Sequence, residues 1–308
     1  MPCYSNMLGN SYKLALNFYF NKEECAMKNY VWLFAPALIV LLFIGLVPIF
    51  PLVNFSVQKP YAEINEFVGL SHFKKMYSDA RWINAIQRTI ILALIVLSIE
   101  IPLGLILAYF LHRPGLLNAI ASAAIVMPAL FPYVSIGLMW RLMCSTVGPV
   151  GRFLNIFGIN YNISIDASQA FATIIVMDVW HWTSITFLIL SAAFAAMDPT
   201  PILAARTEGA TRWQIFRYIQ LPNLAFPLLF AILLRLIDVL KIFDEVYVLT
   251  SGGPGFNTEF VTQYIRNVAL EQWNFGYGSA LSLTYLLIII LLCITIMNIM
   301  TRGRGVLR

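Results

Sequence analysis

Residues 204–222, with the sequence AARTEGATRWQIFRYIQLP, form a polar segment between two long apolar stretches at 171–197 and 224–250. An apolar stretch of about 20 residues is long enough to cross the hydrocarbon core of a bilayer as a helix. The pattern therefore predicts two membrane-spanning helices joined by a loop at the water boundary. We call residues 198–222 the island loop.

The composition of the whole chain agrees with this pattern. Of the 308 residues, 60% are hydrophobic and 11% are charged, and the mean hydropathy is +0.77. These values are typical of a polytopic membrane protein and exclude an ordinary soluble domain. The net charge of +5 reflects lysines and arginines at membrane borders, so we expect no nucleic-acid partner.

The apolar stretches predict an all-α polytopic membrane protein with about six transmembrane helices. The expected spans are 30–53, 86–111, 116–143, 171–197, 224–250 and 280–300. Residues 30–300 would form one transmembrane domain that includes the island loop. Residues 1–29 and 301–308 would be short tails, and the first tail lacks the features of a signal peptide.

The basic residues predict the orientation of the chain. Cytoplasmic loops are enriched in lysine and arginine. An even number of spans with a cytoplasmic N-terminus puts the C-terminal arginines, Arg113 and the island loop on the cytoplasmic side. The first external loop opposes this bias with Lys59, Lys74, Lys75 and Arg81. We expect both termini and the island loop in the cytoplasm.

Local chemistry predicts two short helices in the island loop. Asp198 and Pro199 favour a helix start, because the carboxylate accepts free backbone N–H groups and proline fits the first turn. Gly209 disfavours helix by about 1 kcal/mol relative to alanine and predicts a bend. The expected apolar face consists of Ile202, Ala205, Trp213, Phe216 and Ile219, with Arg206, Arg212 and Arg217 on the other side. Such a loop suits either a docking surface or an interfacial helix near anionic lipid.

The island loop resembles the cytoplasmic loop of importers of the ATP-binding-cassette type. The family pattern is Glu-Ala-Ala, three residues, Gly-Ala, several residues and Leu-Pro. Leu203 stands where the family has its leading glutamate. The residues that the resemblance assigns to ATPase coupling are Ala204, Ala205, Glu208, Gly209, Ala210, Arg212, Phe216, Leu221 and Pro222.

Other stretches carry the resemblance along most of the chain. VGLSHFKKMYSD (68–79), MPALFPYVSIGLMWRLM (127–143), LTSGGPGFNTEF (249–260) and FGYGSA (275–280) are similar to carbohydrate permeases of the maltose and multiple-sugar type, in particular to the first of their two permease subunits. The resemblance begins near Val31, which makes Met27 a candidate start of translation.

The resemblance implies a division of labour between subunits. Such permeases assemble with a second homologous permease, two cytoplasmic ATP-binding-cassette ATPases and an extracytoplasmic solute-binding protein that delivers a sugar-like substrate. They lie in the lipid of the cytoplasmic membrane of bacteria or archaea. The chain has no GxxxxGK[ST] loop to hold nucleotide phosphates, so we expect ATP hydrolysis in a partner.

Ionisable residues inside spans are costly and usually pair or line a water-filled cavity. In the fifth stretch, Arg235, Asp238, Lys241 and Glu245 recur every three or four residues, which predicts one charged helical stripe. Their candidate ion-pair partners on other spans are Glu100, Arg141 and Asp178. We favour structural ion pairs over direct substrate contact for this stripe.

The fourth stretch offers a set of residues suited to a sugar. Asp178 and Trp182 are four residues apart and would share a helix face, which gives a carboxylate for hydroxyl groups beside an aromatic plate for the sugar ring. The expected pathway residues are Trp140, Asp178, Trp182, Asp238 and Tyr247. For Trp140, anchoring at the membrane interface is an equally good interpretation.

Two other classes of function remain open at this point. An ion-coupled secondary transporter would use the intramembrane carboxylates as ion sites, although no two-fold repeat of interrupted helices is evident. A membrane enzyme would need a cluster such as HExxH or GxSxG, and none is present in the sequence. We expect no catalytic residues, metal site or cofactor.

Overall fold

The computed structural model describes residues 34–59 and 66–306, with side chains described up to residue 298. The predicted tail 1–29 and the candidate start at Met27 lie outside the described residues. The chain divides into two compact units, Met1–Phe55 and Ser56–Arg308, which are described separately.

The described part of the first unit is helical. The helix Phe34–Ser56 is 23 residues long and apolar enough to cross a membrane. It contains a turn at Val47 and Pro48, after which α2 (Ile49–Ser56) completes it. This helix corresponds to the predicted span 30–53.

The described part of the second unit is mainly helical and includes one short hairpin, in which β1 (Gln58–Lys59) pairs antiparallel with β2 (Glu66–Phe67). The α-helices before the island loop are α3 (Ser71–Tyr77), α4 (Ala80–Leu111), α5 (Leu116–Val126), α6 (Tyr133–Met143), α7 (Pro149–Ile156) and α8 (Ala167–Ala195). From the island loop onward they are α9 (Thr200–Thr207), α10 (Arg212–Ile215), α11 (Leu221–Asn223), α12 (Ala225–Leu240), α13 (Asp244–Thr250), α14 (Val261–Arg266) and α15 (Phe275–Val306). A 3₁₀ turn, η1, covers Met127–Leu130, and two π-helical turns, η2 and η3, cover Phe216–Gln220 and Asn267–Glu271.

Within the described residues, four helices are long and apolar enough to cross a membrane, and the number rises to six if each of two bent helix pairs is one span. The four are Phe34–Ser56, α4, α8 and Phe275–Asn298 of α15. The bent pairs are Leu116–Leu130 with Tyr133–Met143 and Arg212–Asn223 with Ala225–Leu240. When each bent pair is counted as one span, the prediction of an all-α protein with about six spans is confirmed.

The third predicted span, 116–143, is not one continuous helix. Its two halves meet at an angle of 100°. The break lies at Phe131, whose backbone is extended, with φ −86° and ψ 139°. Phe131 precedes Pro132, and the proline ring disfavours helical conformation in the residue before it. The structure therefore divides the predicted span at this proline.

The fifth predicted span, 224–250, also differs from the structure. Helix α12 ends at Leu240 and α13 begins at Asp244, with Phe243 in a non-helical conformation between them. Arg235 and Asp238 therefore lie on α12, while Glu245 lies on α13. The prediction of a single charged stripe on one helix was wrong because the chain leaves the helix at Lys241.

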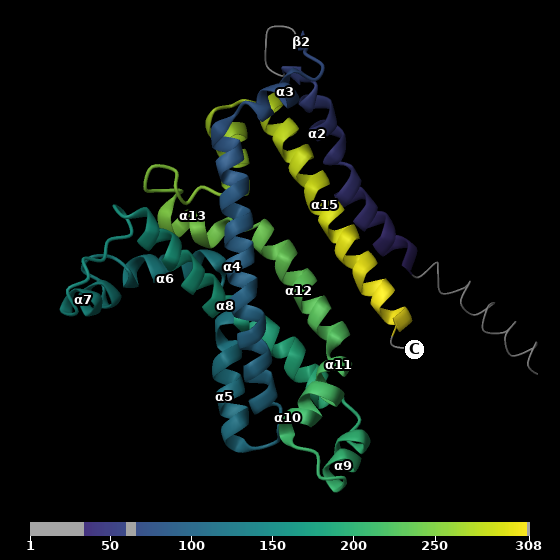
Figure 1. The fold of residues 1–308 in the computed structure, drawn as a ribbon. Coiled ribbons are helices and arrows are strands. Elements are labelled where there is room, and N and C mark those ends of the chain that lie inside the picture. The colour runs from purple at the N-terminus through teal and green to yellow at the C-terminus, as the bar shows by residue number, and fades with distance from the viewer. Residues whose placement is uncertain (1–33, 60–65, 307–308) are drawn as a thin grey trace, which may run out of the picture. The chain divides into compact units, whose positions relative to one another are not determined.

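Helices α4, α8 and α12 form the centre of the second unit. Helix α4 packs along α8, and α12 packs against both (Figure 1). Their shared core is apolar and fully buried, and includes Leu92, Val96, Ile174, Met177 and Val239. Within a bilayer, close van der Waals packing of these side chains stabilises the arrangement, because lipid tails are as apolar as the core itself.

Helices α6 and α13 pack against each other through a glycine. A Cβ atom added at Gly137 would lie 2.5 Å from the carbonyl oxygen of Glu245, closer than real carbon atoms approach. Only glycine allows the two backbones to come this close. Residue 137 therefore fixes the position of α13 beside the bent third span.

The island loop lies at one end of the second unit. Helices α9 and α10 are at this end, whereas α3 and the first turns of α15 pack together at the opposite end (Figure 1). The long helix α4 connects the two ends (Figure 1).

Candidate functional site

The first helix of the island loop begins where the sequence predicts. Helix α9 starts at Thr200 after Pro199, and the carboxylate of Asp198 accepts a hydrogen bond of 2.9 Å from the Thr200 amide. The same bond lowers the pKa of the exposed Asp198 carboxyl below its usual value. The predicted helix start near Pro199 is confirmed.

Helix α9 ends at Thr207, and the chain turns at Gly209, as the predicted bend requires. Gly209 has φ +84°, a conformation that side-chain-bearing residues adopt at a cost of about 1–2 kcal/mol. Its amide donates to the carbonyl of Arg206 at 3.1 Å, and the Ala210 amide donates to the carbonyl of Ala205 at 2.9 Å. These two bonds form a Schellman motif, which satisfies the last carbonyl groups of the helix.

The second helix of the island loop, α10, begins with a capping box. The Gln214 amide donates to the Thr211 hydroxyl at 3.3 Å, and the Thr211 amide donates to the Gln214 side chain at 2.7 Å. This reciprocal pair holds the start of α10 directly after the bend. The prediction of two short helices joined at Gly209 is confirmed.

The predicted apolar face of the island loop is correct only in part. Phe216 and Ile219 are half-buried, but Trp213 is 68% exposed. The buried residue of α10 is Ile215, at 5% exposure. Because α10 is only four residues long and continues into a π-helical turn, the helical spacing used to assign Trp213 does not hold.

The residues assigned to coupling lie along one continuous segment from α9 to α11. Ala204, Glu208, Gly209, Arg212 and Pro222 are exposed, and Ala205, Ala210, Phe216 and Leu221 are half-buried. Leu203, which stands in place of the family glutamate, is 56% exposed. The island loop therefore presents a mixed apolar and basic surface.

Aromatic side chains fasten the island loop to α4 and α8. The ring of Phe216 contacts that of Tyr109 edge-on, with centroids 5.1 Å apart, and Tyr109 contacts Phe194 in the same way at 6.2 Å. Leu224 is fully buried in the same cluster, against residues such as Phe187. A displacement of the island loop would be transmitted directly to the long helices.

A buried ion-pair cluster joins α4, α8 and α12 in the membrane-spanning region. The guanidinium of Arg235 donates to Glu100 at 2.7 Å and to Asp178 at 2.5 Å. Side chains of all three are at most 2% exposed. Thr186 donates to the other oxygen of Glu100 at 2.6 Å. We call Arg235, Glu100 and Asp178 the arginine centre.

Of the three predicted ion-pair partners of the charged residues 235–245, two are confirmed. Glu100 and Asp178 pair with Arg235, whereas Arg141 donates to the carbonyl of Val248 at 3.2 Å. Arg235 also lies over the ring of Trp182, with 4.6 Å between Cζ and the ring. The guanidinium thus contacts both Asp178 and Trp182. Its hydrogen bond to Asp178 occupies one of the two oxygens of that carboxylate.

Two hollows lie beside the arginine centre and share two aromatic residues. One has a volume of about 330 Å³ and is lined by Ala129, Leu130, Phe131, Pro132, Tyr133, His181, Trp182 and Ile185. The other, of about 190 Å³, is lined by Tyr133, Trp182, Asp238, Lys241, Ile242, Phe243, Asp244 and Glu245. The rings of Tyr133 and Trp182 stack between them, with centroids 5.9 Å apart. We call the second hollow the acidic hollow.

The structure brings together some of the predicted pathway residues and separates others. Trp182 and Asp238 line the acidic hollow, and Asp178 lies behind them in the arginine centre. Trp140 contacts Trp180 instead, and Tyr247 stacks on Phe243 and lies beneath Arg266. Neither Trp140 nor Tyr247 lines either hollow.

Sequence reasoning missed Tyr133 and Asp244 as lining residues. Tyr133 follows directly after Pro132, so the broken third span turns it toward α8. A proline within an apolar stretch is the signal that could have found it, because interrupted helices often line cavities in membrane proteins. Asp244 reaches the hollow because α12 ends at Leu240 and α13 begins at Asp244, a break that was not foreseen.

At the opposite end from the island loop, a salt bridge holds the loop 251–260. The carboxylate of Glu259 is fully buried and accepts two hydrogen bonds from Arg81, at 2.6 and 2.7 Å. Asn267 donates to it at 2.7 Å, and Arg88 donates to the Glu259 carbonyl at 3.2 Å. The loop is thereby fixed against the start of α4.

Asp79 caps α4 at the same end. Its carboxylate accepts from the amides of Arg81 and Trp82 and from the hydroxyls of Tyr264 and Tyr277. Partial burial alone would raise the pKa of Asp79, but the four hydrogen bonds favour the charged form and hold this pKa below its usual range.

With this geometry in hand, comparison with known proteins identifies the family. The family model described as "Binding-protein-dependent transport system inner membrane component" matches residues 100–302, well over half of the chain. The chain belongs to this family. It is therefore a multi-pass permease subunit of an ATP-driven importer in the inner membrane, with the ATPase on a separate subunit, and not an ion-coupled secondary transporter.

Two relatives cover most of the chain. The trehalose/maltose transport system permease protein MalF of Thermococcus litoralis is 30% identical over 259 residues, which cover 82% of this chain and 88% of that protein. The lactose transport system permease protein LacF of Rhizobium radiobacter is 28% identical over 269 residues, which cover 85% and 90%.

A solved structure shares the fold. It is the crystal structure of a bacterial ABC transporter involved in the import of the acidic polysaccharide alginate. The TM-score is 0.77 at 18% identity, and the match covers 90% of this chain and 97% of that chain. At this identity the comparison supports the fold of a permease and nothing finer.

Proposed function

We propose that this permease imports a carbohydrate or related polyol and receives the force for transport through the island loop. One observation carries the proposal: an exposed two-helix loop, bent at Gly209, that aromatic rings fasten to the long helices α4 and α8. Relatives named for transport of trehalose, maltose and lactose support the class of substrate.

The proposed assembly follows from the family. The permease pairs with a second homologous permease, two cytoplasmic ATPases and an extracytoplasmic solute-binding protein, in the lipid of a bacterial or archaeal inner membrane. Both termini and the island loop face the cytoplasm, as the arginines of the loop and Arg113 favour. The loop 251–260 then lies on the outer side.

The packing of the long helices supports a route for alternating access. When the ATPases close, the island loop moves and carries α4 and α8 with it through Phe216, Tyr109 and Phe194. The arginine centre ties α12 to the same two helices, so the three move as one body. The acidic hollow lies where α12 meets the bent third span. This movement opens the hollow in turn to the two sides of the membrane.

The acidic hollow suits a polyhydroxylated substrate. Stacked Tyr133 and Trp182 offer apolar ring faces, and Asp238 and Asp244 offer acceptors for hydroxyl groups. Asp238 lies 3.3 Å from Lys241, and both side chains are partly exposed. The charged groups of the hollow are thus accessible, in contrast with those of the arginine centre.

Substitution of Asp238 tests this pathway. We expect Asp238→Asn to raise the half-saturation concentration for uptake about tenfold, because a hydrogen bond to a charged group contributes about 1.5–3 kcal/mol. Lys241→Gln is the matched control, since it breaks the same salt bridge without removing the carboxylate. An equal effect of both substitutions would show that only the ion pair matters and would contradict a substrate contact at Asp238.

The assembly is tested by purification of the tagged chain in mild detergent from its native host, followed by mass spectrometry of stoichiometric partners. We expect a second permease and an ATPase. Recovery of the chain alone, from preparations that preserve other complexes, would contradict the proposed importer.

A further inference from the structure

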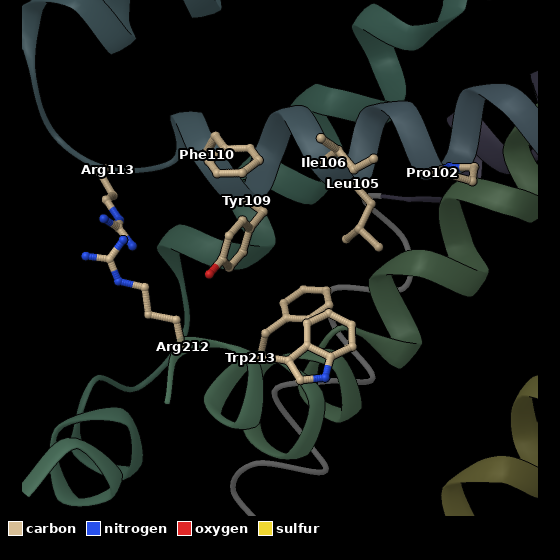
Figure 2. Close-up of a pocket in the computed structure, with 9 residues that line it drawn as sticks. Pro102, Leu105, Ile106, Tyr109, Phe110, Arg113, Arg212 and Trp213 are labelled. Atoms are coloured by element: carbon tan, nitrogen blue, oxygen red, sulfur yellow. The ribbon is translucent and has the colours of Figure 1, made fainter. Parts of the chain in front are cut away.

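A groove separates the second half of α4 from the island loop. It has a volume of about 560 Å³, and Figure 2 shows the side chains that line it. It is lined by Pro102, Leu105, Ile106, Tyr109, Phe110, Arg113, Arg212, Trp213 and Phe216. Most of this lining is apolar, and Ile106 and Phe110 are 53% and 65% exposed.

Two arginines stand together at one end of the groove. The guanidinium groups of Arg113 and Arg212 point toward each other, away from the apolar end at Pro102 (Figure 2). Among the described residues, no carboxylate lies within ion-pair distance of either. Two like charges that face each other repel unless an anion lies between them. The charged end of the groove is therefore complementary to a single anionic group.

The length of the groove matches one leaflet of a bilayer. Pro102 lies nine residues before Leu111, the last residue of α4, which corresponds to about 14 Å at 1.5 Å per residue, and Arg113 lies two residues further on. Half of a hydrocarbon core is about 15 Å thick. The apolar end thus lies near mid-depth of the membrane when the arginines lie at its border. The exposed Trp213 beside them is a residue typical of that border.

We infer that the groove binds one anionic phospholipid from the leaflet on the side of the island loop. Its phosphate lies between Arg113 and Arg212, and an acyl chain lies along Leu105, Ile106 and Phe110. Because Arg113 follows α4 and Arg212 begins α10, the bound lipid bridges the end of a long helix to the loop proposed for coupling. This inference does not depend on the identity of the transported substrate.

Retained lipid is the direct test. The chain would be reconstituted with equimolar phosphatidylglycerol and phosphatidylcholine, purified in detergent, and its retained lipids quantified by mass spectrometry. We expect the wild type to retain phosphatidylglycerol selectively. The double variant Arg113→Gln/Arg212→Gln should lower the ratio of the two retained lipids by at least about tenfold, since each basic residue near an anionic surface contributes about 1 kcal/mol.

The control pair is Arg206→Gln/Arg217→Gln, which removes the same charge from exposed positions of the island loop outside the groove. It should retain the wild-type ratio. An equal fall of the lipid ratio in both double variants would indicate an effect of general surface charge and would overturn the inference. An unchanged ratio in both double variants would overturn it as well. The latter is the result expected if a neighbouring protein fills the groove.

A third variant tests the apolar half. Ile106→Trp adds bulk at an exposed position and leaves both arginines in place. We expect it to reduce total retained phosphatidylglycerol by at least about twofold while the protein stays monodisperse. Unchanged retention would contradict an acyl chain in the groove and with it the proposed site.

Discussion

Arg235 and Arg212 lie in the same chain but in opposite surroundings. Arg235 is 2% exposed and donates to two carboxylates in the centre of the membrane-spanning helices. Arg212 is exposed on the island loop, and no carboxylate of the described residues pairs with it. The first arginine joins three helices of its own chain, and the second is left to an outside partner.

The comparison shows that this permease keeps its rigid, buried ion pairs and its exposed contact surface in different parts of the chain. A buried charge costs several kcal/mol unless it is paired, so the arginine centre must stay intact for the helices to remain packed. An exposed charge carries little of that cost and can change partners. On the proposed function, the helices move as one body and the island loop is the part that docks.

The largest effect is expected from breaking the arginine centre. Arg235→Met would leave Glu100 and Asp178 buried without their cation, and removal of one partner of a buried pair typically destabilises by about 3–5 kcal/mol. We expect a lower midpoint of thermal unfolding in detergent and a poor yield of monodisperse protein.

A triple variant sharpens this test. Arg235→Met/Glu100→Gln/Asp178→Asn removes both carboxylate charges together with the cation and should recover most of the lost stability, because no charge stays unpaired. A single Arg235→Met variant as stable as the wild type would contradict a fastening role for the centre.

An intermediate effect is expected at Asp79, a partly buried and hydrogen-bonded charge. Loss of the helix cap in Asp79→Ala should lower the free energy of unfolding by about 1 kcal/mol at pH 7. The pKa of Asp79 is lowered in the folded state, so its contribution is complete above the unfolded value of about 3.9 and is lost as the pH falls through the folded pKa.

Unfolding of the wild type and Asp79→Ala would be compared at pH 7 and at pH 3. The difference between the two proteins should shrink at the lower pH. Tyr264→Phe removes one hydrogen bond to the carboxylate and should shift this loss to higher pH. A difference that does not change with pH would show that the charge of Asp79 is not what stabilises the fold.

The smallest effect on stability is expected at Arg217, an exposed arginine of the island loop. Arg217→Gln should change the free energy of unfolding by less than about 0.5 kcal/mol, as for other surface substitutions. A loss of several kcal/mol, similar to that of Arg235→Met, would remove the distinction between the two regions.

Much of the fold could be predicted because the bilayer imposes a simple rule of length and hydropathy. The spans around α4, α8 and α15 were placed within several residues. The breaks at Phe131 and Phe243 could not be placed, since a proline or a charged residue in an apolar stretch is compatible with a kink, a loop or a packed helix. Which of these forms depends on the neighbouring helices.

The same limit applies to the candidate sites. An unpaired charge inside the membrane is costly, so the sequence predicted that Arg235 pairs with a carboxylate. The choice of Glu100 and Asp178 over other charges depends on how α4, α8 and α12 pack. The bend at Gly209 depends only on local backbone chemistry and was predicted. The exposure of Trp213 depends on a π-helical turn that no sequence pattern indicated.

The central claim is that the island loop transmits force, and two glycines allow a direct test of it. Gly209 and Gly158 both have positive φ, +84° and +76°, and a Cβ atom at either would meet no heavy atom within 4 Å. Gly209→Glu and Gly158→Glu thus carry similar backbone strain and the same added charge, but only the first lies in the island loop.

We would measure substrate uptake and ATP hydrolysis by the complete importer in proteoliposomes at equal protein abundance. We predict that Gly209→Glu lowers uptake by at least about tenfold, a change of about 1.4 kcal/mol, while Gly158→Glu transports at nearly the wild-type rate. Wild-type uptake by Gly209→Glu, or an equal loss in both variants, would contradict a coupling role for the island loop.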